Sequence, residues 1–354
     1  MNRDNIHYSL NSLMGFNKPL NLIFSGRDAG KTCVIANDII KKNFLNDEVT
    51  AILVWNAVEI SQEYIDSIEK EINQFLGDDE EPYNFIYKLS DIGKKSILTI
   101  NCKDKPIIRF YSYNCPIARI KKALLPNIGA LVHDEICINP EFGEKYPAGM
   151  YKKFREIYTT LERKNKKGKL KFFGFGNLYS LYHPLLMGAG IKASDLRYGT
   201  IKAFGEWAVE WYKLKPELVE YLKARNPFYE DEDYKNYALQ GQNINDEHIK
   251  LAKLSNDFRL CNIFKIEGKY IGIYENVSLR TFIDFHCKII DIELISKYRD
   301  IFCFDFSELT ERTRVLPYSE RVKFSRFKNA MLNNLVSFED INVYYLTEQC
   351  YYNL

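Results

Sequence analysis

The chain has 354 residues, of which 46% are hydrophobic and 27% are charged, so it can form two domains, each with an apolar core. The net charge of only +2 excludes nucleic-acid binding through bulk charge, and any such surface must come from local clustering. The sequence has no run of about 18 apolar residues that could cross a membrane, and no signal peptide. Its eight cysteines lack zinc spacing, which favours reduced thiols in an intracellular protein.

Strands and helices are predicted to alternate in the N-terminal half. Apolar runs predict buried strands at 20–24, 51–55, 130–133 and 170–175. Apolar residues at helical spacing predict helices at 31–43, 61–75 and 148–164. Two further runs, 97–100 and 107–111, predict a hairpin. The alternation indicates an α/β domain with a mostly parallel sheet.

The C-terminal part changes character. Residues 205–258 are typical of helices, interrupted by an acidic turn at 226–233 that contains a proline. Beyond them, runs at 260–264, 270–274 and 279–285 predict a β-meander, and a basic helix is expected near 318–334. We therefore expect an α/β domain at 1–204, a helical linker at 205–258 and a C-terminal α+β domain at 259–354.

A phosphate-binding loop is the strongest local signal. Between a predicted strand and a predicted helix the chain reads Ser25-Gly26-Arg27-Asp28-Ala29-Gly30-Lys31-Thr32. In a P-loop, backbone N–H groups hold the phosphates, the lysine neutralises the β and γ phosphates, and the Thr hydroxyl binds Mg²⁺. Ser25 stands where the pattern has its first glycine, and Gly26 can supply the flexibility. The plainer alternative is a chance helix start.

Arg27 is unusual inside such a loop. It could reach a phosphate or a neighbouring subunit, and a solvated loop arginine is an equal alternative.

An acidic pair follows the strand predicted at 130–133. Asp134 is expected to hold Mg²⁺ and Glu135 to orient or deprotonate the attacking water, which favours ATP hydrolysis over phosphate transfer to a substrate. His133 is polar where such strands are normally apolar, and the alternative is a surface turn. After the strand at 170–175, Asn177 could sense the γ-phosphate, although Gly-Asn is also a routine turn.

Residues 151–171 carry nine basic and two acidic side chains, a net of +7. Such a run is usually a solvated face. Beside an ATP site it could instead contact a DNA backbone or deliver an arginine finger to the next subunit of a ring, with Arg155 and Arg163 as candidates.

The order of these motifs resembles the genome-packaging ATPases of small short-tailed phages of Gram-positive bacteria, terminase-like or FtsK–HerA-like P-loop motors. The resemblance includes the strand and loop at 20–32, Leu-Pro-Asn-Ile at 125–128 leading into 132–135, Thr-Leu-Glu-Arg at 160–163, 176–177, Pro184, the hairpin around 267–269 and the late helix. Trp55-Asn56 departs from it, because relatives often carry basic residues there.

The resemblance implies specific roles and partners. The Arg27–Lys31 pair and the Asp134–Glu135 pair would act with ATP and Mg²⁺, while Arg163 matches a trans-acting arginine. Lys121 matches a trans-acting lysine, with Lys122 an equal candidate. The family forms a homo-oligomeric ring, by resemblance a pentamer. It drives double-stranded DNA through the portal of a procapsid in the host cytoplasm, without a membrane, and a structural packaging RNA is plausible.

The C-terminal domain of that family resembles a degenerate RNase H-type nuclease. Its acids here, Glu267, Asp284, Asp291 and Asp305, show no paired-metal pattern, so nucleic-acid binding without cleavage is expected. The basic candidates for binding are Lys265, Lys269, Arg312, Arg314, Arg321, Lys323, Arg326 and Lys328.

Two other functions compete with packaging. One is a P-loop ATPase of secretion or filament extrusion at a membrane. The other is a non-enzymatic, NTP-gated assembly protein that binds nucleic acid. ATP hydrolysis stimulated by DNA or portal would separate them.

Overall fold

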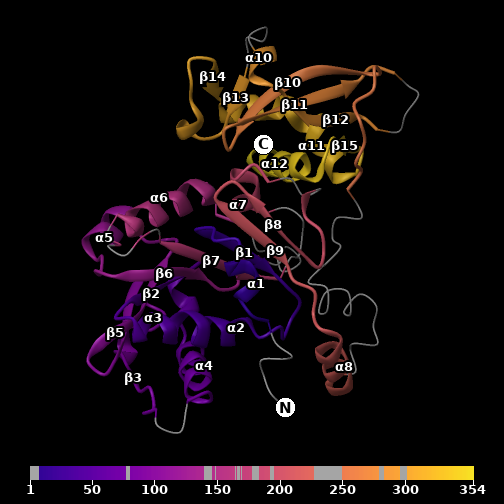
Figure 1. The fold of residues 1–354 in the computed structure, drawn as a ribbon. Coiled ribbons are helices and arrows are strands. Elements are labelled where there is room, and N and C mark those ends of the chain that lie inside the picture. The colour runs from indigo at the N-terminus through magenta and orange to yellow at the C-terminus, as the bar shows by residue number, and fades with distance from the viewer. Residues whose placement is uncertain are drawn as a thin grey trace. The chain divides into compact units, whose positions relative to one another are not determined.

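The computed structural model describes residues 8–354 except 77–79, 139–145, 148, 164, 166–167, 169, 178–182, 192–194, 227–248, 279–282 and 296–300. The described residues form two compact units, 8–226 and 249–354 (Figure 1). Most of the acidic turn predicted at 226–233, the start of the strand predicted at 279–285 and four lysines of the basic run lie outside the described residues.

The first unit is built on a nine-stranded sheet of order β3-β4-β5-β2-β6-β7-β1-β9-β8. The six strands from β5 to β9 in this order are parallel, while β4 and β8 pair antiparallel with β5 and β9, and β3 with β4. The predicted mostly parallel α/β sheet is therefore confirmed. The strands are β1 Leu20–Phe24, β2 Val49–Val54, β3 Phe85–Ile86, β4 Ile97–Cys102, β5 Lys105–Ser112, β6 Ile128–His133, β7 Lys171–Gly176, β8 Thr200–Phe204 and β9 Trp207–Trp211.

Helices cover both faces of this sheet (Figure 1). On one face, α4 buries Ile65, Ile68 and Ile72 against the sheet, and the side chain of Ser61 caps its first turn by accepting from the N–H of Tyr64 at 3.1 Å. The other face packs Phe154 of α6 on β7. The helical segments are α1 Asn11–Met14, α2 Lys31–Val34, η2 Ile35–Lys41, α3 Lys42–Leu45, η3 Ala57–Glu59, α4 Gln62–Asn73, η4 Leu89–Asp91, α5 Ile117–Lys122, α6 Met150–Glu162, α7 Pro184–Gly188 and α8 Pro216–Arg225.

The helix predicted at 31–43 is present as one helical run over 31–45, with a π-helical middle in η2. The prediction of helices from residue 205 is wrong at its start, because β9 is a central strand paired with β1. All five residues of β9 are buried, and the polar Glu210 among them concealed the apolar pattern. The boundary predicted at 204 thus falls inside the β8–β9 hairpin, and among the described residues of 205–258 the helix that agrees with the prediction is α8.

The second unit has a six-stranded sheet of order β14-β13-β10-β11-β12-β15. The predicted antiparallel meander is confirmed for β10 and β11, but its third strand, β12, lies at Phe285–Ile289 and shares only Phe285 with the strand predicted at 279–285. β13 and β14 continue the sheet in parallel beside β10, and β15 lies parallel to β12. The second unit is therefore a separate domain with a mixed sheet. Strand bounds are β10 Phe258–Ile266, β11 Lys269–Asn276, β12 Phe285–Ile289, β13 Ile301–Cys303, β14 Thr313–Val315 and β15 Val336–Phe338.

The helix expected near 318–334 is divided into a 3₁₀ segment, η9 Tyr318–Phe324, and an α-helix, α11 Ser325–Leu332. Phe324 packs edge-on against Phe264 of β10 at 5.1 Å, which anchors the junction of the two segments to the sheet. The other helical segments of this unit are α10 Ile292–Ile295, η8 Phe306–Glu308 and α12 Ile341–Asn353.

A buried hydrogen bond ties the first described residue to β9. The Tyr8 hydroxyl donates to the Glu210 carboxylate at 2.7 Å, and both side chains are buried. Burial raises the pKa of Glu210, while the hydrogen bond from Tyr8 opposes that rise. Because its folded pKa is raised, Glu210 costs the fold stability as pH rises through that pKa and the carboxyl ionises.

We predict that Tyr8→Phe lowers the free energy of unfolding at pH 8 by about 1–3 kcal/mol, because it leaves a buried carboxylate without this donor. The loss should shrink in acid, where Glu210 is protonated and its need for a donor is weaker. Denaturant titrations at several pH values measure this. Tyr87→Phe is the matched control, since it removes the same hydroxyl from an exposed bond to Asp66 and should cost about 0.5 kcal/mol or less. Equal losses in the two variants would contradict the argument.

Candidate nucleotide site

Three neighbouring parallel strands bring the predicted site residues together. In the sheet β7 lies between β6 and β1. The loop at 25–32 follows β1, Asn177 follows β7, and the Asp134–Glu135 pair follows β6. Because parallel strands share one carboxyl edge, all three segments meet there, which is where open α/β sheets bind ligands.

The loop itself has the shape of a phosphate cradle. Its first residue, Ser25, donates its N–H to the Gly176 carbonyl of β7 at 3.0 Å. Asp28 and Gly30 then adopt left-handed backbone angles, φ 56° and 87°, the second of which a glycine accepts without strain. The helical run begins at Lys31, so its first N–H groups stand beside the loop, an arrangement that favours an anion. Arg27 is exposed at the loop tip.

Ala29 anchors the loop to the rest of the first unit. Its side chain is 1% exposed and packs with three leucines of the segment that leads into and forms α8, Leu214, Leu218 and Leu222. Its carbonyl accepts from the Tyr8 N–H at 2.9 Å. The loop is therefore held both by β7 and by the end of the first unit.

Lys31 and Asn177, far apart in sequence, meet at this edge. The Lys31 ammonium donates to the Asn177 side-chain oxygen at 2.5 Å and to the Gly26 carbonyl at 3.5 Å. Burial lowers the pKa of Lys31, and the negative charges of Glu135 and Asp134 oppose that shift. Both oxygens that accept from this ammonium among the described residues are neutral, so a buried ammonium so placed is suited to bind a polyphosphate.

The surroundings of the acidic pair shift the pKa of Asp134. Burial, followed by the charge of Glu135, raises the pKa of Asp134 to about 6, and Lys31 opposes the rise. The Tyr64 hydroxyl donates to Asp134 at 3.4 Å. Mg²⁺ in nucleotide sites takes one or two carboxylates and completes its shell with phosphate and water, so Asp134 with the Thr32 hydroxyl is a fitting donor set. Among the described residues no three His, Cys, Asp or Glu side chains form a metal-binding group of their own.

An aromatic cluster that sequence reasoning did not assemble lies beside the acidic pair. Trp55, which follows β2, stacks on Tyr113 with ring centroids 4.9 Å apart and meets the buried His133 edge-on at 4.6 Å. Burial lowers the pKa of His133 to about 3, so this histidine is neutral and packs as an aromatic ring. Two unusual features of the sequence could have indicated this cluster. His133 is polar within an apolar strand, and Trp55 stands where the resembled ATPases often carry a basic residue.

Arg163 lies at the opposite edge of the sheet, while Lys121 lies in the last turn of the short helix α5. Helices α5 and α6 run side by side from the carboxyl edge (Figure 1), where Lys153 donates to the Cys115 carbonyl at 2.9 Å. By the last turn of α6, Tyr158 donates to the Leu170 carbonyl, next to the amino end of β7. Arg163, which follows this turn, therefore stands about 20 Å, one strand length, from the loop of its own chain.

Both of these cations are exposed, as are their rivals Arg155 and Lys122. The choices between Arg155 and Arg163, and between Lys121 and Lys122, stay open. Lys164, Lys166, Lys167 and Lys169 lie outside the described residues.

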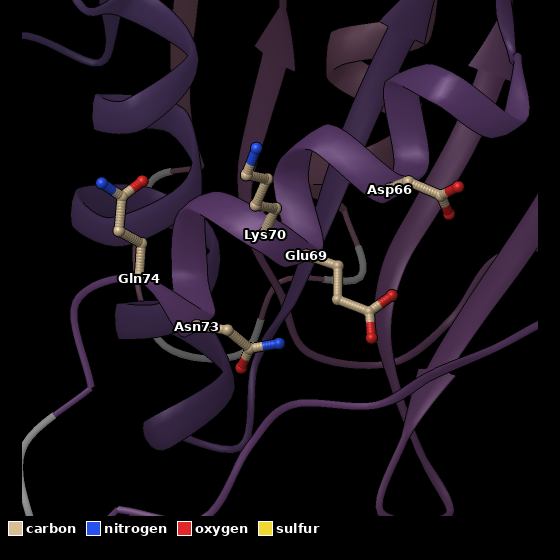
Figure 2. Close-up of a pocket in the computed structure, with 5 residues that line it drawn as sticks. All are labelled: Asp66, Glu69, Lys70, Asn73 and Gln74. Carbon is tan, nitrogen blue, oxygen red and sulfur yellow. The ribbon is translucent and has the colours of Figure 1, made fainter.

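A surface cavity of about 590 Å³ lies on α4, away from these residues (Figure 2). Its lining is Asp66, Glu69, Lys70, Asn73 and Gln74. Three of these side chains bond the neighbouring segment: Asn73 both donates to and accepts from the Tyr83 backbone, Glu69 accepts from the Phe85 N–H, and Asp66 accepts from Tyr87. These groups hold β3 to the helix and do not form a second site. In the described ranges no helix is both long and apolar enough to span a bilayer.

Comparison with known proteins gives matches only among solved structures. No protein-family model and no curated protein matches the chain. The phi28 gp11 DNA packaging motor is 17% identical, with 98% of this chain and 97% of that chain covered and a TM-score of 0.65. The bacteriophage phi29 viral genome packaging motor assembly is 12% identical, with 99% of each chain covered and a TM-score of 0.65.

The chain has the fold of these packaging motors. At such low identity the likeness establishes the fold, and it does so over nearly the whole length of each protein. The fold class expected from the sequence, an α/β nucleotide-binding type of domain followed by a second domain with its own mixed sheet, is confirmed.

Proposed function

We propose that this chain is the ATP-hydrolysing subunit of a viral genome-packaging motor that translocates double-stranded DNA into a procapsid. The observation that carries the proposal is the meeting of Lys31, Asn177 and the Asp134–Glu135 pair at one edge of the sheet. The fold shared with two phage packaging motors supports the choice of packaging among P-loop activities.

The residues divide the reaction among them. Loop N–H groups of 26–32 and the Lys31 ammonium bind the β and γ phosphates, and Arg27 adds charge at the loop tip. Glu135 orients the attacking water and accepts its proton. Bound through Thr32 and Asp134, Mg²⁺ would supply charge neutralisation on the phosphate oxygens. Asn177 hydrogen-bonds Lys31 until phosphate replaces it, so its side chain responds to nucleotide.

Arg163 and Lys121 would act in trans. The place of Arg163 at the amino edge keeps it from its own nucleotide, and an exposed cation such as Arg163 or Lys121 can reach the ATP of a neighbouring subunit in a ring. We propose a homo-oligomeric ring, a pentamer by resemblance, that docks on the portal of the procapsid in the host cytoplasm, with a structural packaging RNA as a further partner.

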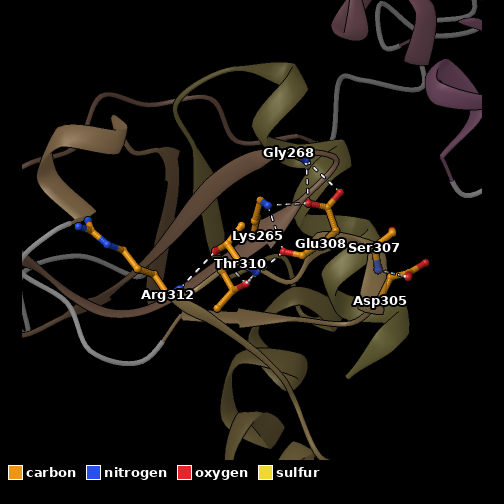
Figure 3. A network of polar contacts seen from close by, with 8 residues as sticks. Lys265, Gly268, Asp305, Ser307, Glu308, Thr310 and Arg312 are labelled. Atoms are coloured by element: carbon orange, nitrogen blue, oxygen red, sulfur yellow. Dashed lines mark hydrogen bonds and ion pairs between the residues drawn. The ribbon is translucent and has the colours of Figure 1, made fainter.

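The second unit would bind nucleic acid without cutting it. Lys265 on its first strand is held internally, since its ammonium pairs with Glu308 at 3.4 Å and donates to the Glu308 carbonyl at 3.0 Å (Figure 3). The Glu308 carboxylate also accepts from the Gly268 N–H, and Asp305 accepts from the Ser307 N–H. These acids are used within the fold. The Arg312 side chain points out of this network and is exposed, so it suits a phosphate backbone better than Lys265 does.

Lys31→Ala should abolish ATP binding, because the described residues place no second ammonium group in the loop. Glu135→Gln should bind ATP normally and lose about 10²-fold or more in hydrolysis, the usual contribution of a positioned base. Nucleotide titration and phosphate release measure the two effects. Lys42→Ala, an exposed lysine of the same helical run, is the control and should change neither. Normal turnover of Lys31→Ala would remove the assignment of the loop.

Mixed rings test the role of Arg163. Arg163→Ala and Glu135→Gln subunits should each hydrolyse ATP slowly, and their mixture should recover part of the rate, because one shared site can join an intact Glu135 to an intact Arg163. Arginine fingers contribute about 10³–10⁵ in rate, so the recovery is measurable. Mixtures with Arg155→Ala serve as the comparison. If assembled rings show recovery only with Arg155→Ala, then Arg155 is the finger.

The full chain should bind double-stranded DNA with an affinity that falls steeply as salt rises, and should leave supercoiled plasmid intact with Mg²⁺ or Mn²⁺. Replacing Arg312 and Arg321 together by Ala should weaken binding and reduce its salt dependence. Lys103→Ala, an exposed cation of the first unit, should do neither. Metal-dependent cleavage that is lost in Asp284→Ala or Asp305→Ala would show a working nuclease.

A further inference from the structure

The backbone at Glu135 is held in an unfavourable conformation. Its φ of 53° lies in the left-handed region, which a residue with a side chain adopts at a cost and keeps only where neighbouring groups hold it. The turn leaves Glu135 exposed, while Asp134 before it is half-buried and Ile136 after it is fully buried. The conformation of this one residue thus decides where its carboxylate stands at the edge of the site.

Three hydrogen bonds hold the segment from outside. The Trp55 indole N–H donates to the Glu135 carbonyl at 3.1 Å. The Ile136 N–H donates to the Phe175 carbonyl of β7 at 2.7 Å. His183 contacts the Ile136 carbonyl through Nε2 at 3.1 Å. Consecutive carbonyls are therefore held by two aromatic side chains from different elements.

The protonation of His183 follows from its second contact. Its Nδ1 accepts from the Leu185 N–H at 3.2 Å as the cap of α7, so the ring hydrogen is on Nε2, which donates to the Ile136 carbonyl. Each of its ring nitrogens has one fixed partner.

Trp55 is itself firmly placed. Its N–H donates to Glu59 at 3.0 Å and its carbonyl accepts from the Ser112 hydroxyl at 3.3 Å, which fixes its backbone after β2. Its ring is stacked on Tyr113. The indole N–H is the single side-chain donor of tryptophan, and it is directed at Glu135.

We propose that Trp55 and His183 are positioning residues that hold the catalytic Glu135 in its left-handed turn, so that removing either N–H slows hydrolysis without weakening ATP binding. The inference rests on the proposed function, because it assigns these residues to the water-activating step of that site. Neither side chain has to touch nucleotide. If Trp55 acted only by packing, Trp55→Phe would leave the rate of hydrolysis unchanged, because phenylalanine keeps the aromatic stack on Tyr113 and lacks only the N–H donor.

Trp55→Phe in the full chain should lower kcat for DNA-stimulated phosphate release about 10- to 10²-fold, because a shift of about 1 Å in a catalytic group can cost that much. The Kd for ATP should stay unchanged. In the Glu135→Gln background, Trp55→Phe should have no further effect, because the carboxylate that it positions is gone. Trp207→Phe makes the same change in the buried β9 and should leave kcat as it is.

His183→Asn is the second variant, since asparagine still caps α7 but cannot present the imidazole Nε2–H to Ile136. It should show the same kcat loss with intact ATP affinity. The inference is overturned if Trp55→Phe and His183→Asn keep kcat, if they lose ATP affinity and rate together, or if they slow Glu135→Gln by the same factor as wild type. A normal rate for Glu135→Gln itself would instead remove the proposed role of Glu135.

Discussion

A desolvated ammonium group is the constraint on which the first unit depends. Lys31 donates to the oxygens of Asn177 and Gly26 at the carboxyl edge of the sheet, and its burial makes the ionised form costly, which lowers its pKa. Asp134 and Glu135 relieve part of that cost from the next strand but one. The strand order that puts β7 between β1 and β6 is what brings a loop lysine, an amide and two carboxylates within mutual influence.

The parts of the fold that could be predicted from sequence are those with long, uniform patterns. Central strands such as β2 are buried on both faces and read as continuous apolar runs, and α4 shows its stripe at helical spacing. β9 was missed because Glu210 interrupts its apolar run, and the bond from Tyr8 that makes a buried carboxylate tolerable lies 202 residues away. β13, β14 and β15 have three residues each, too few to establish a period.

In the candidate site too, some residues could be predicted from sequence motifs and others only from the tertiary structure. Lys31, Thr32 and the Asp134–Glu135 pair are contiguous motifs, and their meeting follows from a parallel sheet. The contacts of Trp55 and His183 with 135–136 could not be predicted, because they join a residue after β2 and a helix cap to the backbone of another loop. Nor does the sequence reveal that Arg163 ends at the opposite edge from the P-loop, which depends on the direction of α6.

Ala29 has a structural role within the loop at 25–32. The P-loop pattern allows any residue at this position. Here the side chain is sealed against Leu214, Leu218 and Leu222, so a larger residue would have to displace α8. The size of side chain that position 29 accepts is thus limited by a helix nearly two hundred residues downstream, so a larger residue at 29 would need a smaller one among the leucines of α8.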